Sequence, residues 1–263
     1  MKLEDYRAFT ETLTQILQAD LRVLGLIAVG SMAEQDYKPD EWSDHDFFVV
    51  VESGLQNFFR TNLEWLPESD RIAFSYQETE HGSKVLYSDG HLLEFAVFDL
   101  KELHLAKVNR YRILIDRGPV RDHLAQILAD TTHWAQSLQA DDRFLFGQFL
   151  TNLLVAAGRF RRGERLSALS FLYGSATRHL ALLICKYVPA LDAKVLDNID
   201  PLRRLEAAYP DLALELERVL TSDVVETAVA LLRIADRELK ESMPQYPGNI
   251  IQILESLLAA NLK

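Results

Sequence analysis

Hydrophobic residues recur along this chain at two spacings, and the pattern changes near residue 118. Apolar positions three or four residues apart predict helices over residues 3–19 and 55–66. Between and after them lie short apolar runs of strand length, at residues 23–29, 46–51, 71–78, 83–88, 91–99 and 111–116. Beyond Pro119 no stretch has a convincing strand pattern, and helical spacing dominates, most clearly at residues 144–160, 166–187, 224–241 and 250–262.

The order of these elements predicts an α+β protein. We expect a mixed sheet with flanking helices in an N-terminal domain of residues 1–118. An all-α helical bundle then fills residues 119–263. Gly118 and Pro119, which favour a turn, mark the boundary.

Composition narrows the class of protein. Of the 263 residues, 48% are hydrophobic and 25% are charged, which is ordinary for a globular chain. Apolar runs such as residues 23–29 are far shorter than the roughly 20 residues that cross a bilayer, so no membrane partner is expected. Met1–Asp5 does not resemble a secretory signal, and the single cysteine, Cys185, cannot form an internal disulfide. These features favour a cytoplasmic location.

The formal net charge of −11 argues against a nucleic-acid partner, because binding to phosphate backbones needs clustered Lys and Arg. It does not argue against a nucleotide substrate, since a metal ion can screen phosphates from carboxylates.

The segment with the clearest chemistry is a Gly-Ser bend followed by two aspartates. Gly30 and Ser31 end the apolar strand 23–29, and Asp44 and Asp46 come at the start of the next strand. Glycine lets the backbone approach a ligand, and a serine hydroxyl with backbone N–H groups can hold phosphate oxygens. Two carboxylates two positions apart on a strand share one face and suit Mg²⁺, whereas His45 faces the other way.

A third carboxylate is expected on a neighbouring strand. Glu94 is a charged residue within the apolar run 92–98, and it can bind metal or accept a proton if that strand pairs beside residues 46–51. Asp99 is the competing candidate, but its odd separation from Glu94 places it on the opposite face. The alternatives without function are a strand-start cap for Asp44 with Ser43 and a solvent-facing edge charge for Glu94.

This arrangement of Gly30-Ser31, Asp44-His45-Asp46 and Leu93-Glu94-Phe95 resembles the nucleotidyltransferase superfamily of the DNA polymerase β type. With a helical second half, it is most similar to the aminoglycoside and lincosamide adenylyltransferases. The motifs span roughly residues 20–118. Two features depart from the family pattern: His45 stands where an apolar residue is usual, and residues 32–43 lack a glycine.

The resemblance implies a site and a reaction. Gly30 and Ser31 would contact the triphosphate of ATP or another nucleotide, Asp44, Asp46 and Glu94 would hold one or two Mg²⁺ ions, and Glu94 would be the base. A hydroxyl of a small acceptor would then receive the nucleoside monophosphate. In this resemblance residues 1–118 would be the catalytic domain and residues 119–263 a helical domain that binds substrate.

Two points are left open by the sequence. Arg162 belongs to a basic cluster in the helical half that either contacts phosphate or is a solvated helix end. The chain could also modify a protein hydroxyl, as antitoxin-type members of the superfamily do, or be a non-catalytic nucleotide-binding regulatory module.

Overall fold

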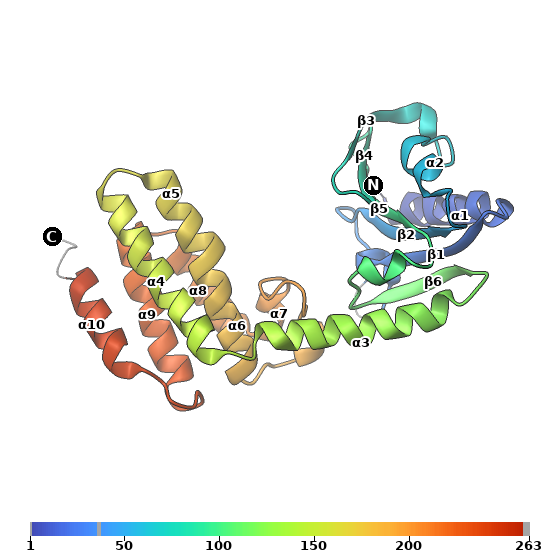
Figure 1. Cartoon of the computed structure of the whole chain (residues 1–263). Helices are drawn as coiled ribbons and strands as arrows, with labels where there is room; N and C mark the ends of the chain where they lie inside the picture. Colours follow the sequence, from blue (N-terminus) through green and yellow to red (C-terminus); the bar gives the residue numbers. More distant parts are fainter. Residues whose placement is uncertain (1, 36–37, 260–263) are drawn as a thin grey trace. The chain divides into compact units, whose positions relative to one another are not determined.

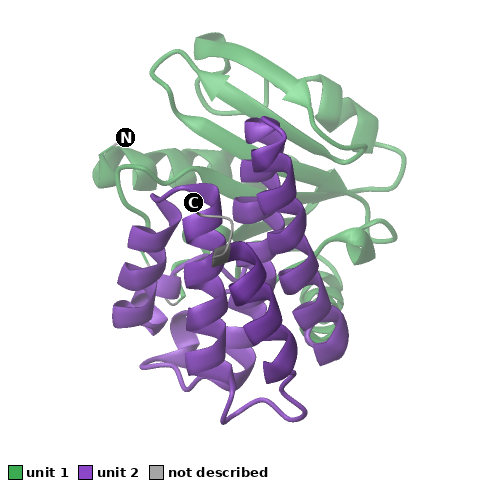
Figure 2. Cartoon of the chain, turned by 90° about the vertical axis from the view of Figure 1, so that its left-hand side faces the viewer, with its two compact units in different colours: residues 1–133 green, residues 134–263 purple. Residues whose placement is uncertain are grey.

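The computed structural model describes residues 2–35 and 38–259, and contacts divide the chain into two units, residues 1–133 and 134–263 (Figure 2). The first unit contains the sheet and the second is helical, so the structure is the α+β architecture that the sequence predicts (Figure 1). The boundary falls within helix α3 (Val120–Leu138), fifteen residues beyond Gly118.

In the described part of the first unit, six strands form one mixed sheet in the order β3-β4-β5-β2-β1-β6. β2 and β5 are parallel and the other neighbours are antiparallel. Every strand lies within two residues of a run predicted from the sequence. The bounds are β1 (Val23–Val29), β2 (His45–Val51), β3 (Ile72–Gln77), β4 (Gly82–Tyr87), β5 (Leu92–Phe98) and β6 (Tyr111–Asp116).

Helix α1 (Leu3–Ala19) covers one face of this sheet. Its buried stripe of Tyr6, Phe9, Leu13 and Leu17 packs in one cluster with residues of β1, β2, β4 and β5. The opposite face is covered over part of its area by the first turns of α3. There Val120 and Leu124 pack with residues of β1, β2 and β5, and the hydroxyl of Thr131 accepts a hydrogen bond from the Val108 N–H.

The second predicted helix is shorter than expected. α2 spans Gln56–Thr61 only, and its apolar pattern continues in a turn rather than in a helix. The Asn62 side chain accepts a hydrogen bond from the Glu64 N–H, which forms a local turn that competes with helical hydrogen bonds. Leu66 is nevertheless buried, so spacing alone could not distinguish the two conformations. Short 3₁₀ segments are η1 (Gly30–Ala33), η2 (Ser69–Arg71) and η3 (Leu103–Leu105).

In the described residues of the second unit, helices joined by turns are the only regular secondary structure. Two of its long helices begin at aspartate caps, since Asp141 and Asp223 accept hydrogen bonds from the N–H groups of Phe144 and Val225. The elements are α4 (Asp142–Arg161), α5 (Arg165–Leu169), the π-helix η4 (Ser170–Ala176), α6 (Thr177–Tyr187), η5 (Ala193–Val195), α7 (Leu205–Ala208), α8 (Pro210–Leu220), α9 (Val224–Leu239) and α10 (Gly248–Ala259). Residues 260–262, which complete the last predicted helix, lie outside the described residues.

One continuous helical segment of the described chain, Arg165–Tyr187, is long and apolar enough to cross a membrane. Half of its most apolar stretch is buried within the structure, and Leu172, Leu180 and Leu183 belong to the core of the helical unit. The segment therefore has the burial expected of a core helix.

Candidate functional site

The Gly30-Ser31 bend follows the end of β1, and Asp44 and Asp46 lie at the start of β2. Because β1 and β2 are antiparallel, these residues are at the same end of the two strands. Gly30 has φ +56°, and a Cβ built on it would lie only 2.4 Å from Oδ2 of Asp46. The Asp46 carboxylate thus lies in space that any other side chain at position 30 would need. This contact explains why a glycine ends the strand here, and it places the bend directly beside a predicted metal ligand.

Ser31 is buried just beyond Gly30, in the four-residue segment η1. Its hydroxyl lies 3.5 Å from the Asp44 carbonyl oxygen, which also accepts a hydrogen bond of 3.0 Å from the Tyr6 hydroxyl. Burial raises the pKa of Tyr6, and the nearby charges of Asp46 and Asp44 raise it further. Tyr6 is therefore a neutral donor that links α1 to the backbone at Asp44.

Asp46 and Glu94 are register partners in the parallel pair β2–β5. Directly paired residues of neighbouring strands point to the same face, so both carboxylates are on the sheet face opposite α1. The alternation along β2 agrees, because His45 and Phe47 are buried while Asp46 is only partly covered. The structure therefore brings together Gly30, Ser31, Asp46 and Glu94, with Asp44 one residue before β2.

Glu94 also forms an ion pair with a lysine. The ammonium of Lys84 on β4 lies 2.8 Å from Glu94 Oε1 and 3.1 Å from Glu78 Oε1. Its hydrogen bonds to these two carboxylates raise the pKa of Lys84, and the bond to Glu94 has the larger effect. Lys84 was not identified as a partner from the sequence, because a single lysine within a strand carries no pattern.

The fit of a divalent cation depends on how many carboxylates converge. Among residues 2–35 and 38–259, no group of three or more His, Cys, Asp or Glu side chains is gathered closely enough to hold a metal ion. Asp46 at the start of β2 and Asp44 just before it would still provide the one or two carboxylates that Mg²⁺ normally takes, with substrate phosphates and water as further ligands. Glu94 as a third ligand stays a prediction.

His45 lies on the opposite face, as the strand period predicts, and is completely buried. Its ring stacks on Tyr6, with centroids 3.8 Å apart, and its Nδ1 is 2.7 Å from Nε2 of His91. The Thr10 hydroxyl donates to the Tyr6 carbonyl, so Nε2–H of His45 is the donor toward Thr10, and Nδ1 accepts from His91. Burial lowers the pKa of His45 to about 3 and of His91 to about 4.

The bend is held from the side of β6 as well. The Arg112 guanidinium donates to the Met32 carbonyl and to the Glu34 carboxylate, each at 3.1 Å. The Gln35 side chain donates to the Tyr111 carbonyl at 2.8 Å. Arg112 was not identified from the sequence, because a single arginine near a strand end carries no pattern.

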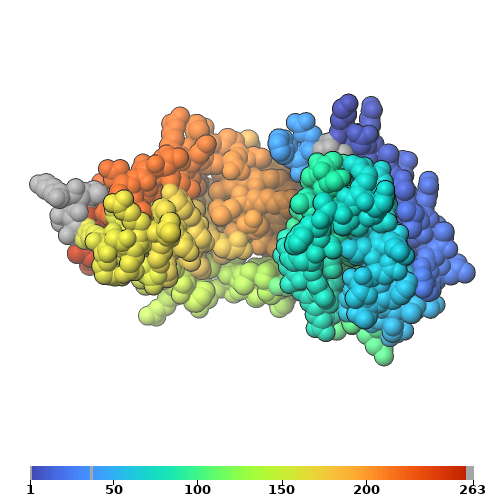
Figure 3. Space-filling view, turned by 90° about the horizontal axis from the view of Figure 1, so that it is seen from above, coloured from blue at the N-terminus to red at the C-terminus, as the bar shows by residue number. Residues whose placement is uncertain are grey.

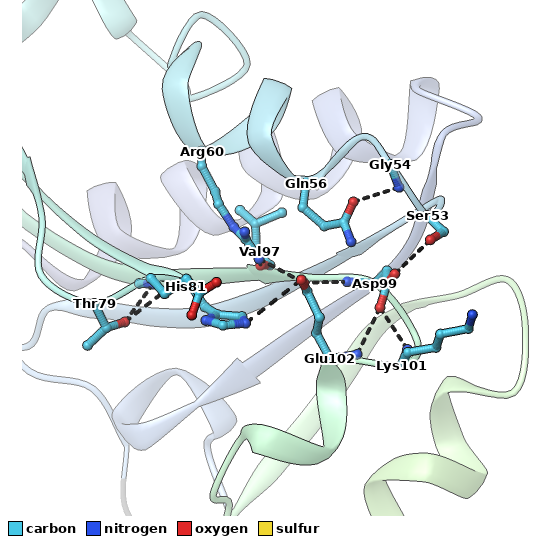
Figure 4. A network of polar contacts seen from close by, with 12 residues as sticks. Ser53, Gly54, Gln56, Arg60, Thr79, His81, Val97, Asp99, Lys101 and Glu102 are labelled. Carbon is cyan, nitrogen blue, oxygen red and sulfur yellow. Dashed lines mark hydrogen bonds and ion pairs between the residues drawn. The ribbon is translucent and has the colours of Figure 1, made fainter.

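Asp99, the competing carboxylate, has a structural role at the end of β5. It is buried, and its oxygens accept hydrogen bonds from the Lys101 and Glu102 N–H groups and from the Ser53 hydroxyl (Figure 4). In the same network Arg60 donates to the Val97 carbonyl and to Glu102. The Asp99 carboxylate therefore caps the turn that leads into η3.

Arg162 ends helix α4 in the other unit. Its side chain is 62% exposed and pairs with Glu164 at 2.9 Å. Neighbouring Arg159 lies over the ring of Phe171 and contacts Ser167. These contacts order the end of the helix, and a phosphate contact of Arg162 stays a prediction.

A hollow of about 820 Å³ opens in the first unit, with Asp44 in its wall. Its lining comes from α1, residues 41–44, the segment around η2 and the turn before β5. Carboxylates outnumber the one guanidinium among its charged residues, which are Asp5, Glu41, Asp44, Glu68, Asp89 and Arg71. The hollow is therefore suited to a neutral or cationic molecule rather than to a free anion.

Comparison with known proteins yields no matching family model and no matching curated protein. Similar solved structures include an aminoglycoside 6-adenyltransferase from Bacillus subtilis, with 13% identity and a TM-score of 0.33 over 94% of this chain and 96% of that one. A second is the CdnC:HORMA-deltaN complex of E. coli MS115-1, with 14% identity and a TM-score of 0.32 over 89% of this chain and 90% of the other. Similarity at this level does not assign an activity.

Proposed function

We propose that this chain is a Mg²⁺-dependent nucleotidyltransferase that moves a nucleoside monophosphate, with ATP as the expected donor, onto a hydroxyl of a small acceptor. The observation that carries the proposal is the register that sets Glu94 directly opposite Asp46, beside the Gly30 bend. The sequence motif requires two carboxylates on adjacent strands next to a backbone bend that leaves room for a ligand, and Asp46, Glu94 and Gly30 have this arrangement.

Each residue has a chemical role in this proposal. Asp44 and Asp46 would hold Mg²⁺, which, when bound, neutralises phosphate charge and polarises the α-phosphate. Gly30 leaves room for the triphosphate, the Ser31 hydroxyl and nearby backbone N–H groups donate to its oxygens, and Arg162 is a further candidate phosphate contact.

Glu94 accepts the proton of the acceptor hydroxyl while the hydroxyl oxygen attacks the α-phosphorus. The new bond joins that oxygen to phosphorus, the bond to the bridging oxygen breaks, and pyrophosphate leaves. By the resemblance of the sequence motifs, the acceptor that we propose is an aminoglycoside-like or lincosamide-like compound.

The test is transfer of label from α-labelled ATP. The full chain is incubated with Mg²⁺ and a panel of aminoglycosides, lincosamides and soluble cell extract, and products are separated by size and charge. We expect label on a small hydroxylated compound. Label on protein would show instead that the acceptor is a macromolecule, and no transfer from ATP, GTP, CTP or UTP would overturn the proposal.

The base is tested by Glu94→Gln, which keeps the shape and removes the charge. We expect about 10²–10⁴-fold slower transfer, the usual contribution of a general base. Glu64→Gln is the matched control, because Glu64 is exposed in the turn after α2. An unchanged rate in Glu94→Gln would remove this role while leaving the transferase activity standing.

A further inference from the structure

The strand β3 forms one edge of the sheet and carries no charge. It pairs with β4 at the end of the strand order, and within the described residues no strand lies on its other side (Figure 1). Five of its six residues, Ile72–Gln77, are exposed, and with β4 they form part of the surface coloured cyan to green in Figure 3. Edge strands of natural proteins usually carry a charge or a proline that prevents pairing with another chain, and β3 has neither.

The backbone groups of β3 alternate in direction. The Glu78 N–H donates to the Gly82 carbonyl at 2.9 Å, and in an antiparallel pair the residues that bond the partner strand are two positions apart. Tyr76 therefore directs its N–H and carbonyl toward β4, whereas Ser75 and Gln77 direct theirs away from the sheet. These outward groups are able to pair with a further strand.

Two aromatic side chains lie on either side of Ser75, on one face of the sheet. Phe74 is 60% exposed and Tyr76 is 45% exposed, and their ring centroids are 5.9 Å apart. Leu86 on β4 is the register partner of Phe74 and is 40% exposed, so it extends the same apolar surface. Covering this surface would remove apolar area from water, which favours association.

A second copy of the same strand fits this edge. A two-fold axis through Ser75 would set that residue opposite itself, and the two copies would exchange two hydrogen bonds there. Phe74 of each copy would then lie opposite Tyr76 of the other, in the more closely spaced type of antiparallel pair. The strand is self-complementary because its outward backbone groups and its two aromatic residues are placed symmetrically about Ser75.

We propose that β3 is a dimer interface, at which two chains pair edge to edge and join their sheets into one. The proposal does not depend on the nucleotidyltransferase activity. A strand of six residues is about 20 Å long, and an edge of that length buries less than the roughly 800 Å² per partner of a standard stable interface. The dimer is therefore reversible, with a Kd on the order of 10–100 µM.

Opposite charges at the two-fold axis test this register. Sedimentation velocity of the full chain at about 1–300 µM should show a reversible change from monomer to dimer. Ser75→Lys places two ammonium groups opposite each other, and Ser75→Glu places two carboxylates there, so each variant alone should dimerise about 10-fold more weakly or worse. An equimolar mixture of the two variants should dimerise at least as tightly as the wild type, because each pair then has opposite charges.

Leu21→Lys and Leu21→Glu are the matched controls. Leu21 is 79% exposed in the turn before β1, and these variants change the net charge by the same amounts. We expect them to change the Kd by less than about twofold. Higher NaCl should tighten the wild-type dimer, since each chain has a formal net charge of −11 and salt screens the repulsion between copies.

Three results would overturn the proposal. The first is a wild-type chain that stays monomeric at the highest concentration. The second is a dimer that Ser75→Lys leaves intact, or a mixture of the two charged variants that dimerises no better than each alone, because the contact would then lie elsewhere. The third is a series of oligomers that keeps growing with concentration, since it would show head-to-tail contacts and exclude the two-fold pairing.

Discussion

His45 accepts a hydrogen bond at its Nδ1 from Nε2–H of His91, and the two nitrogens are 2.7 Å apart. The pair joins the starts of β2 and β5, the two parallel strands that carry Asp46 and Glu94. Nε2–H of His45 in turn donates a hydrogen bond to the Thr10 hydroxyl on α1. The strand ends beneath the proposed site are thus connected to each other and to the covering helix by buried, neutral donors.

The first prediction is that acid destabilises the chain through these two rings. Their folded pKa values of about 3 and about 4 lie below the roughly 6.5 of an unfolded histidine. The unfolded state therefore binds more protons between pH 6.5 and 4, and the free energy of unfolding falls as the pH is lowered through this range, by roughly 2–4 kcal/mol at pH 5 relative to pH 7. Urea unfolding at several pH values measures it.

His91→Gln, which can still donate to His45, should remove about half of this pH dependence. His104 is exposed at η3 and provides the control, since His104→Gln should leave the dependence unchanged. If the His91 variant unfolded with the same pH profile as the wild type, burial of the pair would not be the cause.

A second prediction concerns the space above Gly30. In Gly30→Ala, the new methyl group would meet the Asp46 carboxylate at 2.4 Å and the residue would keep a positive φ. Gly54→Ala imposes positive φ alone, because nothing lies within 4 Å of a Cβ there. We expect about 1 kcal/mol of lost stability for the Gly54 variant and about 2–4 kcal/mol for the Gly30 variant.

Chemical unfolding of both variants at pH 7.5 gives the comparison directly. Equal losses would show that the Asp46 side chain moves aside at little cost, and the close approach would then not constrain the site.

The third prediction concerns Arg112, which holds the Met32 carbonyl and Glu34 beside the bend. Arg112→Met removes two hydrogen bonds of about 0.5–1.5 kcal/mol each. The bend should then occupy other conformations, so that the KM for nucleotide rises about 5–20-fold while kcat changes less than about threefold. Transfer kinetics at varied ATP concentration measure the two parameters separately.

Arg121→Met is the control for that experiment. Arg121 is exposed and pairs with Asp116 at the other end of β6, away from the bend. A similar rise of the nucleotide KM in both variants would point to a general electrostatic effect and not to the hydrogen bonds of Arg112 beside the bend.

Local pattern was enough to predict much of the first unit. Residues 92–98 were predicted as one apolar strand that carries Glu94, and the strand period placed Asp46 and His45 on opposite faces. Positions within one strand or helix depend on the chain's own geometry, which is why these assignments did not need a fold. Where short-range turn chemistry competes with an apolar pattern, as at Asn62, the same reasoning failed.

What the sequence by itself determined is therefore the set of strands, the Gly30-Ser31 bend and the opposite faces of His45 and Asp46. Only the tertiary structure decided that β5 lies parallel beside β2 with Glu94 opposite Asp46, that Lys84 reaches Glu94, and that His91 and Arg112 support the site. The physical reason is that strand order and register result from long-range packing of whole apolar faces. A charged or polar partner brought in by that packing leaves no periodic signal in its own segment.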